Sequence, residues 1–174
     1  MRKFLVTLSV LSFLLFGCVS SHPALETVAS VDIDKYAGLW HEIASFPQKF
    51  QEGCHCTTAN YTKSEEGFLI VENRCNKDSI TGAESYIKGK AFMQEGSNNA
   101  KLSVQFFWPF KGDYWIIDLD SNYSYAVVGH PNRNYLWILS RTPQMDETQY
   151  TEIIKRAADK GFDITRLNKT IQCK

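Results

Sequence analysis

Cysteines are the residues of this chain with the most specific chemistry, and four lie in its body: Cys54, Cys56, Cys75 and Cys173. Outside the cytoplasm thiols oxidise in pairs, and four cysteines allow three pairings. A hairpin about the Glu-Glu-Gly turn at 65–67 places Cys54 or Cys56 opposite Cys75 and leaves the other for Cys173. The alternative is a zinc site, because three thiolates and the imidazole of His55 are zinc ligands. Cys54 and Cys56, with one residue between them, share a strand face. An oxidising compartment favours disulfides over a zinc site.

The fifth cysteine, Cys18, ends a leader. Arg2 and Lys3 precede an apolar run over 4–16, which is shorter than the ~20 residues of a membrane-spanning helix and is typical of a signal peptide. Residues 15–18 read Leu-Phe-Gly-Cys and resemble the bacterial lipobox, whose cysteine is acylated and becomes the new N-terminus. The alternative is an ordinary secretory signal with a chance cysteine at this position.

The lipobox interpretation divides the chain into three parts. Residues 1–17 form the signal peptide, residues 18–30 the acylated cysteine with a flexible tether, and residues 31–174 one folded domain. Two or more acyl chains anchor a protein stably, because each buried methylene contributes about 0.8 kcal/mol. Val19 stands where aspartate resembles an inner-membrane retention signal, so we expect a lipid anchor in the outer membrane, on its periplasmic face.

Motifs for catalysis are missing from the sequence. It has no Gly-x-Ser-x-Gly elbow, no glycine-rich phosphate loop and no His-Glu-x-x-His. The four histidines are dispersed along the chain: His22, His41, His55 and His130. We therefore predict no enzyme, no cofactor and no metal.

The composition sets the broad class. A chain of 174 residues with 44% hydrophobic content suits one well-buried domain, and its 11 Phe, 8 Tyr and 4 Trp favour strands and apolar pockets. Lys and Arg number 19, as do Asp and Glu, and the basic residues are scattered. Because the chain has neither a net nor a clustered positive charge that would attract a polyanion, we predict no nucleic-acid partner.

The body of the chain reads as short strands separated by turns. Runs rich in aromatic and β-branched residues predict eight strands, over 39–46, 55–63, 68–75, 84–93, 101–107, 114–119, 124–130 and 135–140. Their connections are too short for crossover helices, so successive strands pair antiparallel. We predict an all-β fold, an eight-stranded up-and-down barrel with room for one small apolar ligand.

One helix is expected after the last strand. Asp146 can cap it, apolar residues then recur at helical spacing, and Gly161 ends it. The recurring residues are Tyr150, Ile153, Ile154, Ala157 and Ala158. We expect this apolar stripe to pack on the outside of the barrel, the alternative being a membrane-binding face.

Two sequence motifs resemble those of a known protein family. The Gly38-Leu39-Trp40 stretch and the residues up to position 46 are similar to the opening motif of lipocalins, and 135–143, which contain Arg141, are similar to their closing motif. With residues 104–110, the chain most resembles the bacterial outer-membrane lipocalins and their animal relative apolipoprotein D. It departs from the family at 120–122, where a Thr-Asp-Tyr-like run is usual, and at Trp108, where the nearer relatives commonly have glycine.

The resemblance implies roles for the motif residues. We expect Gly38 and Trp40 to close one barrel end and Arg141 to stack on the indole, which contributes about 0.5–2 kcal/mol; the alternative is that Trp40 contacts ligand. Residues 56–61 resemble the strand of apolipoprotein D whose cysteine joins the C-terminal tail. This implies the disulfides Cys56–Cys173 and Cys54–Cys75.

The resemblance also places a loop and a chemistry. The loop at 46–50 lies at the open end in the family, where Phe46 and Phe50 could form a lid. A lipocalin-like prostaglandin synthase uses a barrel cysteine as its nucleophile, but every cysteine of the body here has a disulfide partner to hand.

Strand alternation predicts the lining of the barrel. With the cysteine face of the second strand outward, Thr57 and Ala59 point inward. The same rule gives the candidate ligand-binding residues Tyr61, Phe68, Ile70, Glu72, Ala91, Met93, Val104, Phe106, Tyr114, Ile116 and Trp137. This lining suits an acyl chain with a polar head near the mouth.

We therefore expect a lipid-binding protein that stores or transports fatty acids or lysophospholipids in membrane maintenance. The alternative is a structural or interaction lipoprotein whose barrel is filled by side chains. A homodimer is a possible arrangement of the anchored chain.

Overall fold

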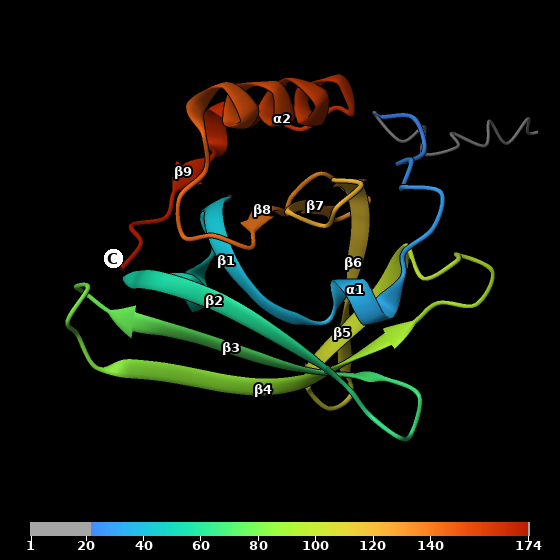
Figure 1. Ribbon diagram of the computed structural model, residues 1–174, viewed down its shortest axis with the longest axis horizontal. Helices are drawn as coiled ribbons and strands as arrows, with labels where there is room; N and C mark the ends of the chain where they lie inside the picture. Colours follow the sequence, from blue (N-terminus) through green and yellow to red (C-terminus); the bar gives the residue numbers. More distant parts are fainter. Residues whose placement is uncertain (1–21, 174) are drawn as a thin grey trace, which may run out of the picture.

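The computed structural model describes residues 22–173 (Figure 1). Eight strands follow one another along the chain: β1 (Gly38–Ser45), β2 (Cys54–Lys63), β3 (Leu69–Lys77), β4 (Glu84–Met93), β5 (Lys101–Phe107), β6 (Phe110–Leu119), β7 (Tyr125–Gly129) and β8 (Leu136–Ser140). The remaining elements are α1 (Ile33–Tyr36), η1 (Lys49–Gln51), α2 (Glu147–Asp159), η2 (Ile164–Arg166) and β9 (Asn168–Lys169). All eight predicted strands are present.

Strand β1 closes the sheet into a barrel. Each strand from β2 to β8 pairs antiparallel with the next, and His41 of β1 lies opposite Ser140 of β8 on one side and Thr58 of β2 on the other. A bulge between Glu42 and Ala44 bends β1 so that it can pair with both β2 and β8. The predicted antiparallel up-and-down barrel is confirmed.

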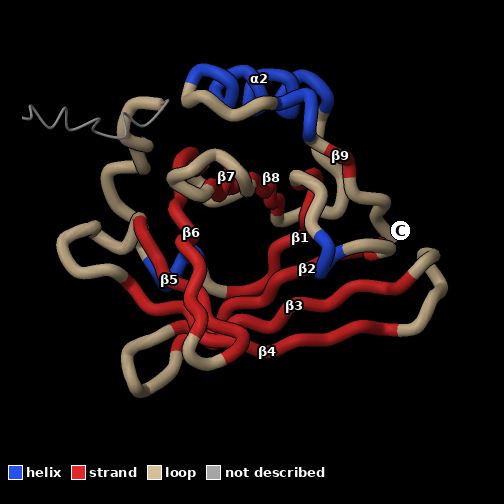
Figure 2. The backbone as a smooth tube through the Cα atoms, turned by 180° about the vertical axis from the view of Figure 1, so that it is seen from behind, coloured by secondary structure: helices blue, strands red, loops and turns tan. Residues whose placement is uncertain are grey.

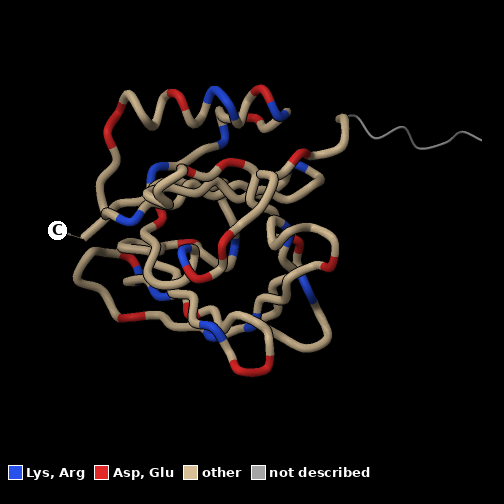
Figure 3. The backbone as a smooth tube through the Cα atoms, turned by 45° about the vertical axis from the view of Figure 1, so that its right-hand side comes forward, with Lys and Arg blue, Asp and Glu red and all other residues tan. Residues whose placement is uncertain are grey.

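The two ends of the barrel differ. Because the strands alternate in direction, the loops at 46–53, 78–83, 108–109 and 130–135 share one end, which we call the open end. Figure 2 shows the strands arranged in a ring, with α2 outside it. The loops at 64–68, 94–100 and 120–124 share the other, the closed end, together with α1. Basic and acidic residues are interleaved along α2 and the loops (Figure 3).

The hairpin of β2 and β3 has a different register from the one that the sequence predicted. A hairpin about the predicted turn at 65–67, with Cys54 opposite Cys75, would pair Tyr61 with Phe68, but Tyr61 lies opposite Val71. Residues 64–68 form a five-residue loop in which the Ser64 amide donates to the Phe68 carbonyl at 2.9 Å. A shift of three residues exchanges the two faces of β3.

The turn between β5 and β6 is also tighter than predicted. The predicted strands over 101–107 and 114–119 leave residues 108–113 for the turn, whereas Phe107 pairs with Phe110 across the cis Trp108-Pro109 peptide. Strand β6 therefore begins four residues earlier than predicted. The hairpin tip projects Trp108 from the open end of the barrel.

Helix α2 packs against the outside of the barrel (Figure 1). The Asp146 carboxylate caps it by accepting from the amides of Thr148 and Gln149, as expected. Its buried residues Ile153 and Ala157 join a cluster of strand residues with Phe46 and Ile138. The apolar stripe thus serves docking, and no helix among residues 22–173 has the length and apolarity to cross a bilayer.

The residues before α1 correct the expectation of a flexible tether up to residue 30. Leu25 is 5% exposed, and the Val28 amide donates to the Ile116 carbonyl at 3.0 Å. The Arg133 side chain donates to the Pro23 carbonyl at 2.8 Å. The described part of this segment is held on β6 and the β7–β8 loop, because the backbone of Val28 and Pro23 is hydrogen-bonded to them and Leu25 is buried.

Candidate ligand-binding cavity

The closed end is sealed by the motif residues Gly38, Trp40 and Arg141. Trp40 is 0% exposed, and its indole N–H donates to the Tyr36 carbonyl at 2.8 Å. The Arg141 guanidinium lies over the indole, 3.7 Å from its ring centre, and donates to the Leu39 carbonyl at 2.7 Å. Gly38 has φ +95°, a conformation that favours glycine. Trp40 and Arg141 contribute no surface to the cavity described next.

A cavity of about 500 Å³ occupies the barrel interior above this seal. Its walls come from strands β2, β3, β5, β6 and β8 and are mostly apolar: Thr57, Thr58, Ala59, Tyr61, Val71, Asn73, Val104, Phe106, Gly112, Tyr114, Trp137 and Leu139. Its mouth at the open end is formed by Glu42, Phe50, Gln51, Phe107, Phe110, Lys111, Asp113, His130 and Tyr135. The volume lies within the ~300–1,000 Å³ of small-molecule sites.

Three tyrosine hydroxyls meet at the floor. The Tyr61 hydroxyl donates to the Tyr114 hydroxyl at 2.8 Å, and the hydroxyls of Tyr36 and Tyr114 share a hydrogen bond of 2.7 Å. Burial raises the pKa of Tyr61 to about 12, and for the same reason the pKa values of Tyr36 and Tyr114 lie well above the ordinary value. The floor is therefore uncharged at neutral pH.

Polar groups without protein partners lie on the wall formed by β2 and β3. Thr57 is 7% exposed, and neither its hydroxyl nor the Asn73 side-chain carbonyl has a hydrogen-bond partner among the described residues. An unpaired buried polar atom costs about 1–3 kcal/mol. A ligand hydroxyl or a water at this wall would accept from the Thr57 hydroxyl and donate to the Asn73 carbonyl.

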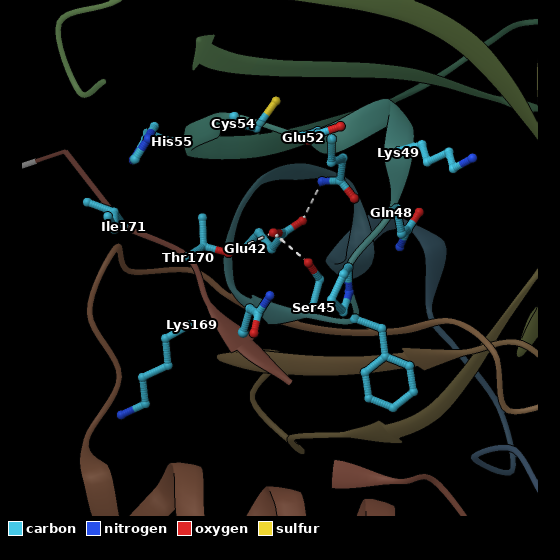
Figure 4. Close-up of a pocket in the computed structure, with 15 residues that line it drawn as sticks. Glu42, Ser45, Gln48, Lys49, Glu52, Cys54, His55, Lys169, Thr170 and Ile171 are labelled. Carbon is cyan, nitrogen blue, oxygen red and sulfur yellow. Dashed lines mark hydrogen bonds between the residues drawn. The ribbon is translucent and has the colours of Figure 1, made fainter. Parts of the chain in front are cut away.

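Glu42 and Gln51 connect the mouth to a second, polar pocket outside the barrel wall, of about 550 Å³ (Figure 4). The buried Glu42 carboxylate accepts from Ser45 at 3.0 Å, Gln51 at 2.8 Å and Thr170 at 2.6 Å. The side-chain carbonyl of Gln51 in turn accepts from the Trp137 indole N–H at 3.3 Å. The hydrogen bond from Thr170 to Glu42 joins the C-terminal segment to β1. Since the Glu42 carboxylate already accepts from three donors, it has little capacity left for a ligand.

The structure divides the predicted lining residues into three groups. Those on the cavity wall are Thr57, Ala59, Tyr61, Val104, Phe106, Tyr114 and Trp137. Those inside the barrel but packed in the core beside the cavity are Ala91, Met93 and Ile116. The third group, on β3 and before it, lies outside: Phe68, Ile70 and Glu72.

The outward position of the third group corrects the expected face of β3. Val71 lines the cavity, so its neighbours Ile70 and Glu72 point away from it. The Glu72 carboxylate accepts from the exposed Tyr86 hydroxyl at 2.7 Å. Phe68 packs on the Phe92 ring, 5.6 Å between centres. The three-residue change of register described above is the cause.

Strand alternation did not predict Val71, Asn73 and Leu139 on the walls, or Phe107 and Phe110 at the mouth. A loop of five residues at 64–68, had it been recognised, would have placed Val71 and Asn73 on the inner face of β3. The expected lid is wrong for Phe46, which is 0% exposed and packs on Phe162 beneath α2. Phe50 is at the mouth, as expected, and is 70% exposed.

All four cysteines of the body are paired in the structure. Cys54 is bonded to Cys75 and Cys56 to Cys173, the pairs that the family resemblance implied. Cys56 has φ +53° in a bulge opposite Cys75, which turns its side chain toward the C-terminal tail. Within residues 22–173 no group of three His, Cys, Asp or Glu side chains is arranged for a metal ion. Cys18 and the signal peptide lie outside the described residues.

Comparisons with known proteins agree with this geometry. A family model described as a lipocalin-like domain matches residues 31–172. Temperature-induced lipocalin-1 of Arabidopsis thaliana is 39% identical over 157 residues, covering 85% of this chain and 83% of that protein. Outer membrane lipoprotein Blc of Escherichia coli strain K12 is 38% identical over 165 residues, covering 93% of this chain and 92% of that protein. The solved structure of insecticyanin from the tobacco hornworm Manduca sexta is similar in fold, with a TM-score of 0.71 at 19% identity over 89% of this chain and 88% of that one.

Proposed function

The chain belongs to the lipocalin-like family, and from this premise we propose that it binds a single-chain lipid, a fatty acid or a lysophospholipid, inside its barrel. The protein stores or carries this lipid at the outer membrane and so serves membrane maintenance. Its task is binding rather than catalysis.

The observation that carries the proposal is the cavity. It is sealed at one end by Trp40 and Arg141, bounded by apolar walls, and open at the other end. Burying a methylene there contributes about 0.8 kcal/mol, so a long acyl chain has ample driving force even after the costs of association. A second acyl chain would need far more room than about 500 Å³, which favours lipids with one chain.

The distribution of polar groups supports one orientation for the lipid. The acyl chain lies against Val71, Val104 and Leu139, and the head group lies toward the mouth. Both unpaired polar groups on this path suit a lipid head group: the Thr57 hydroxyl can donate to an ester oxygen, and the Asn73 carbonyl can accept from a glycerol hydroxyl.

Anchoring through Cys18 completes the proposal. The lipobox-like residues 15–18 and the similarity to a protein named as an outer membrane lipoprotein support it. The Cys18→Ser variant should accumulate as an unacylated precursor outside the outer-membrane fraction. Cleaved Cys18→Ser protein in that fraction would contradict the anchor.

Native mass spectrometry tests the binding function. The chain without residues 1–18 is incubated with palmitate, with lysophosphatidylethanolamine or with a diacyl phospholipid that has the same head group. We expect one bound molecule per barrel for the two single-chain lipids and far less of the diacyl lipid. No mass increase with any lipid would favour the alternative, a structural lipoprotein with a filled barrel.

A further inference from the structure

The most exposed large aromatic side chains of the described residues gather at the open end. They are Phe50 (70% exposed), Phe107 (70%), Trp108 (86%) and Phe110 (76%), and we call them the rim aromatics. Phe50 precedes β2, and the other three form the tip of the β5–β6 hairpin. Large apolar side chains that remain exposed together mark a surface that meets a partner or a membrane.

Ligand binding in the cavity does not account for all of this surface. Phe50, Phe107 and Phe110 border the mouth, but Trp108 is not part of the cavity lining. The hairpin pairs Phe107 with Phe110, so Trp108 is held out at its very tip. Tryptophan is enriched at the interface between water and lipid, where its ring is buried and its N–H is still hydrated.

The N-terminal segment reaches the same end of the barrel. Arg133, in the β7–β8 loop, donates to the Pro23 carbonyl, and Leu25 is buried against the barrel. Cys18 stands five positions before Pro23. Five residues span at most about 18 Å, so a lipid on Cys18 keeps the bilayer within that distance of Pro23, which lies against the β7–β8 loop of the open end.

We propose that the open end faces the membrane, with the rim aromatics inserted in the lipid interface and the mouth of the cavity directed at the bilayer. The orientation rests on the proposed anchor at Cys18. Lys49 and Lys111, each next to a rim aromatic in the chain, lie beside the phosphate groups. A single-chain lipid then passes between bilayer and barrel without crossing bulk water.

Quenching of tryptophan fluorescence by brominated lipids tests this orientation. The mature acylated protein, which begins at Cys18, is placed in phosphatidylcholine vesicles with or without bromine on the upper acyl carbons. The emission of Trp108 is taken as the difference between the parent and the Trp108→Phe variant. We expect bromine to reduce that emission at least twofold.

Two variants make the result specific. Ala59→Phe places a ring in the space of the acyl chain and weakens lipid binding in the cavity. Quenching of the same size in this background therefore comes from the bilayer, which separates the orientation from the lipid-binding function. Leu39→Trp, made in the Trp108→Phe background, places a reporter at the closed end, where Leu39 is 48% exposed. We expect no quenching there. Unquenched Trp108, or a quenched reporter at position 39, overturns the proposal. Unquenched Trp108 in a protein that dimerises only while Trp108 is present assigns the rim to a second copy.

Discussion

The Arg141 guanidinium lies 3.7 Å from the centre of the Trp40 ring and holds the chain of the closed end to it. It donates to the carbonyl of Leu39 at 2.7 Å and to that of Ala37 at 3.0 Å. Replacing Arg141 with Gln should lower the free energy of unfolding by about 2–4 kcal/mol, because the stacking and several charged hydrogen bonds are lost together. Urea unfolding measures this loss.

The matched control for Arg141 is Arg74. It also stacks on an aromatic ring, 4.5 Å from the centre of Tyr86, but on the exposed surface beside Glu84. Arg74→Gln should change the free energy of unfolding by less than about 1 kcal/mol. Lipid affinity should stay the same in both variants. A large loss of affinity in Arg141→Gln at unchanged stability would place Arg141 in the binding site.

The two disulfides should contribute unequally. Cys56–Cys173 joins residues 117 positions apart, whereas Cys54–Cys75 joins residues 21 apart. Loop-closure entropy assigns them about 5 and 3 kcal/mol, so the double serine variant of the first pair should unfold at lower urea. Non-reducing peptide mapping establishes the pairs. A Cys54–Cys173 peptide would show that the pairing is wrong.

The barrel was predictable because its signals are local. Alternating strands, short turns and a capped helix after residue 146 are each written in a few neighbouring residues. The position of the helix on the barrel followed from its apolar stripe. The bend of β1 at Glu42 and the packing of 22–30 on the barrel depend on distant partners, which no local pattern reports.

The cavity lining was harder to predict, because strand faces depend on the count of residues in each loop. Phe68 looks like the first residue of a strand, yet it ends the loop that begins at Ser64. This single difference exchanges Ile70 and Glu72 for Val71 and Asn73. On β2 and β5, where the expected starts are nearly right, Tyr61 and Val104 face the cavity as predicted.

The tyrosine cluster predicts a loss of stability in alkali. The pKa of Tyr61 is about 12 in the folded protein and ~10 in the unfolded chain. Since the unfolded chain releases the proton first, the stabilisation is complete below pH ~10 and declines as the pH rises toward 12. Tyrosinate absorbance should show these hydroxyls ionising together with unfolding, separately from the exposed tyrosines.

Tyr114 is the centre of that cluster. Tyr114→Phe leaves the hydroxyls of Tyr36 and Tyr61 without their common partner and should cost about 1–3 kcal/mol at neutral pH. The alkaline decline should also become shallower, because one group with a raised pKa is gone. Tyr86→Phe, on the exposed surface, is the control and should be nearly neutral. Equal effects of the two variants would contradict a buried hydroxyl cluster.

Neighbouring residues of β2 test the direction of the cavity wall. Ala59 lines the cavity and Asn60 faces the other way. Ala59→Phe should reduce lipid affinity at least tenfold, since the ring occupies the space of the acyl chain, while Asn60→Phe should leave affinity unchanged. Isothermal titration with a lysophospholipid gives both values. Equal affinities would mean that the lipid binds elsewhere.

Trp137 should report lipid binding by a change in its fluorescence. Its indole lies on the cavity wall, stacks on Tyr135 at 6.0 Å between ring centres, and donates to Gln51 near the mouth. A long acyl chain that buries most of its methylenes displaces water from this indole, and micromolar affinity or better is expected. Titration of the chain without residues 1–18 should quench the emission, and Trp137→Phe should remove the response. Trp115→Phe is the control, because Trp115 belongs to the cluster beneath α2. A response that persists in Trp137→Phe would place the lipid outside the barrel.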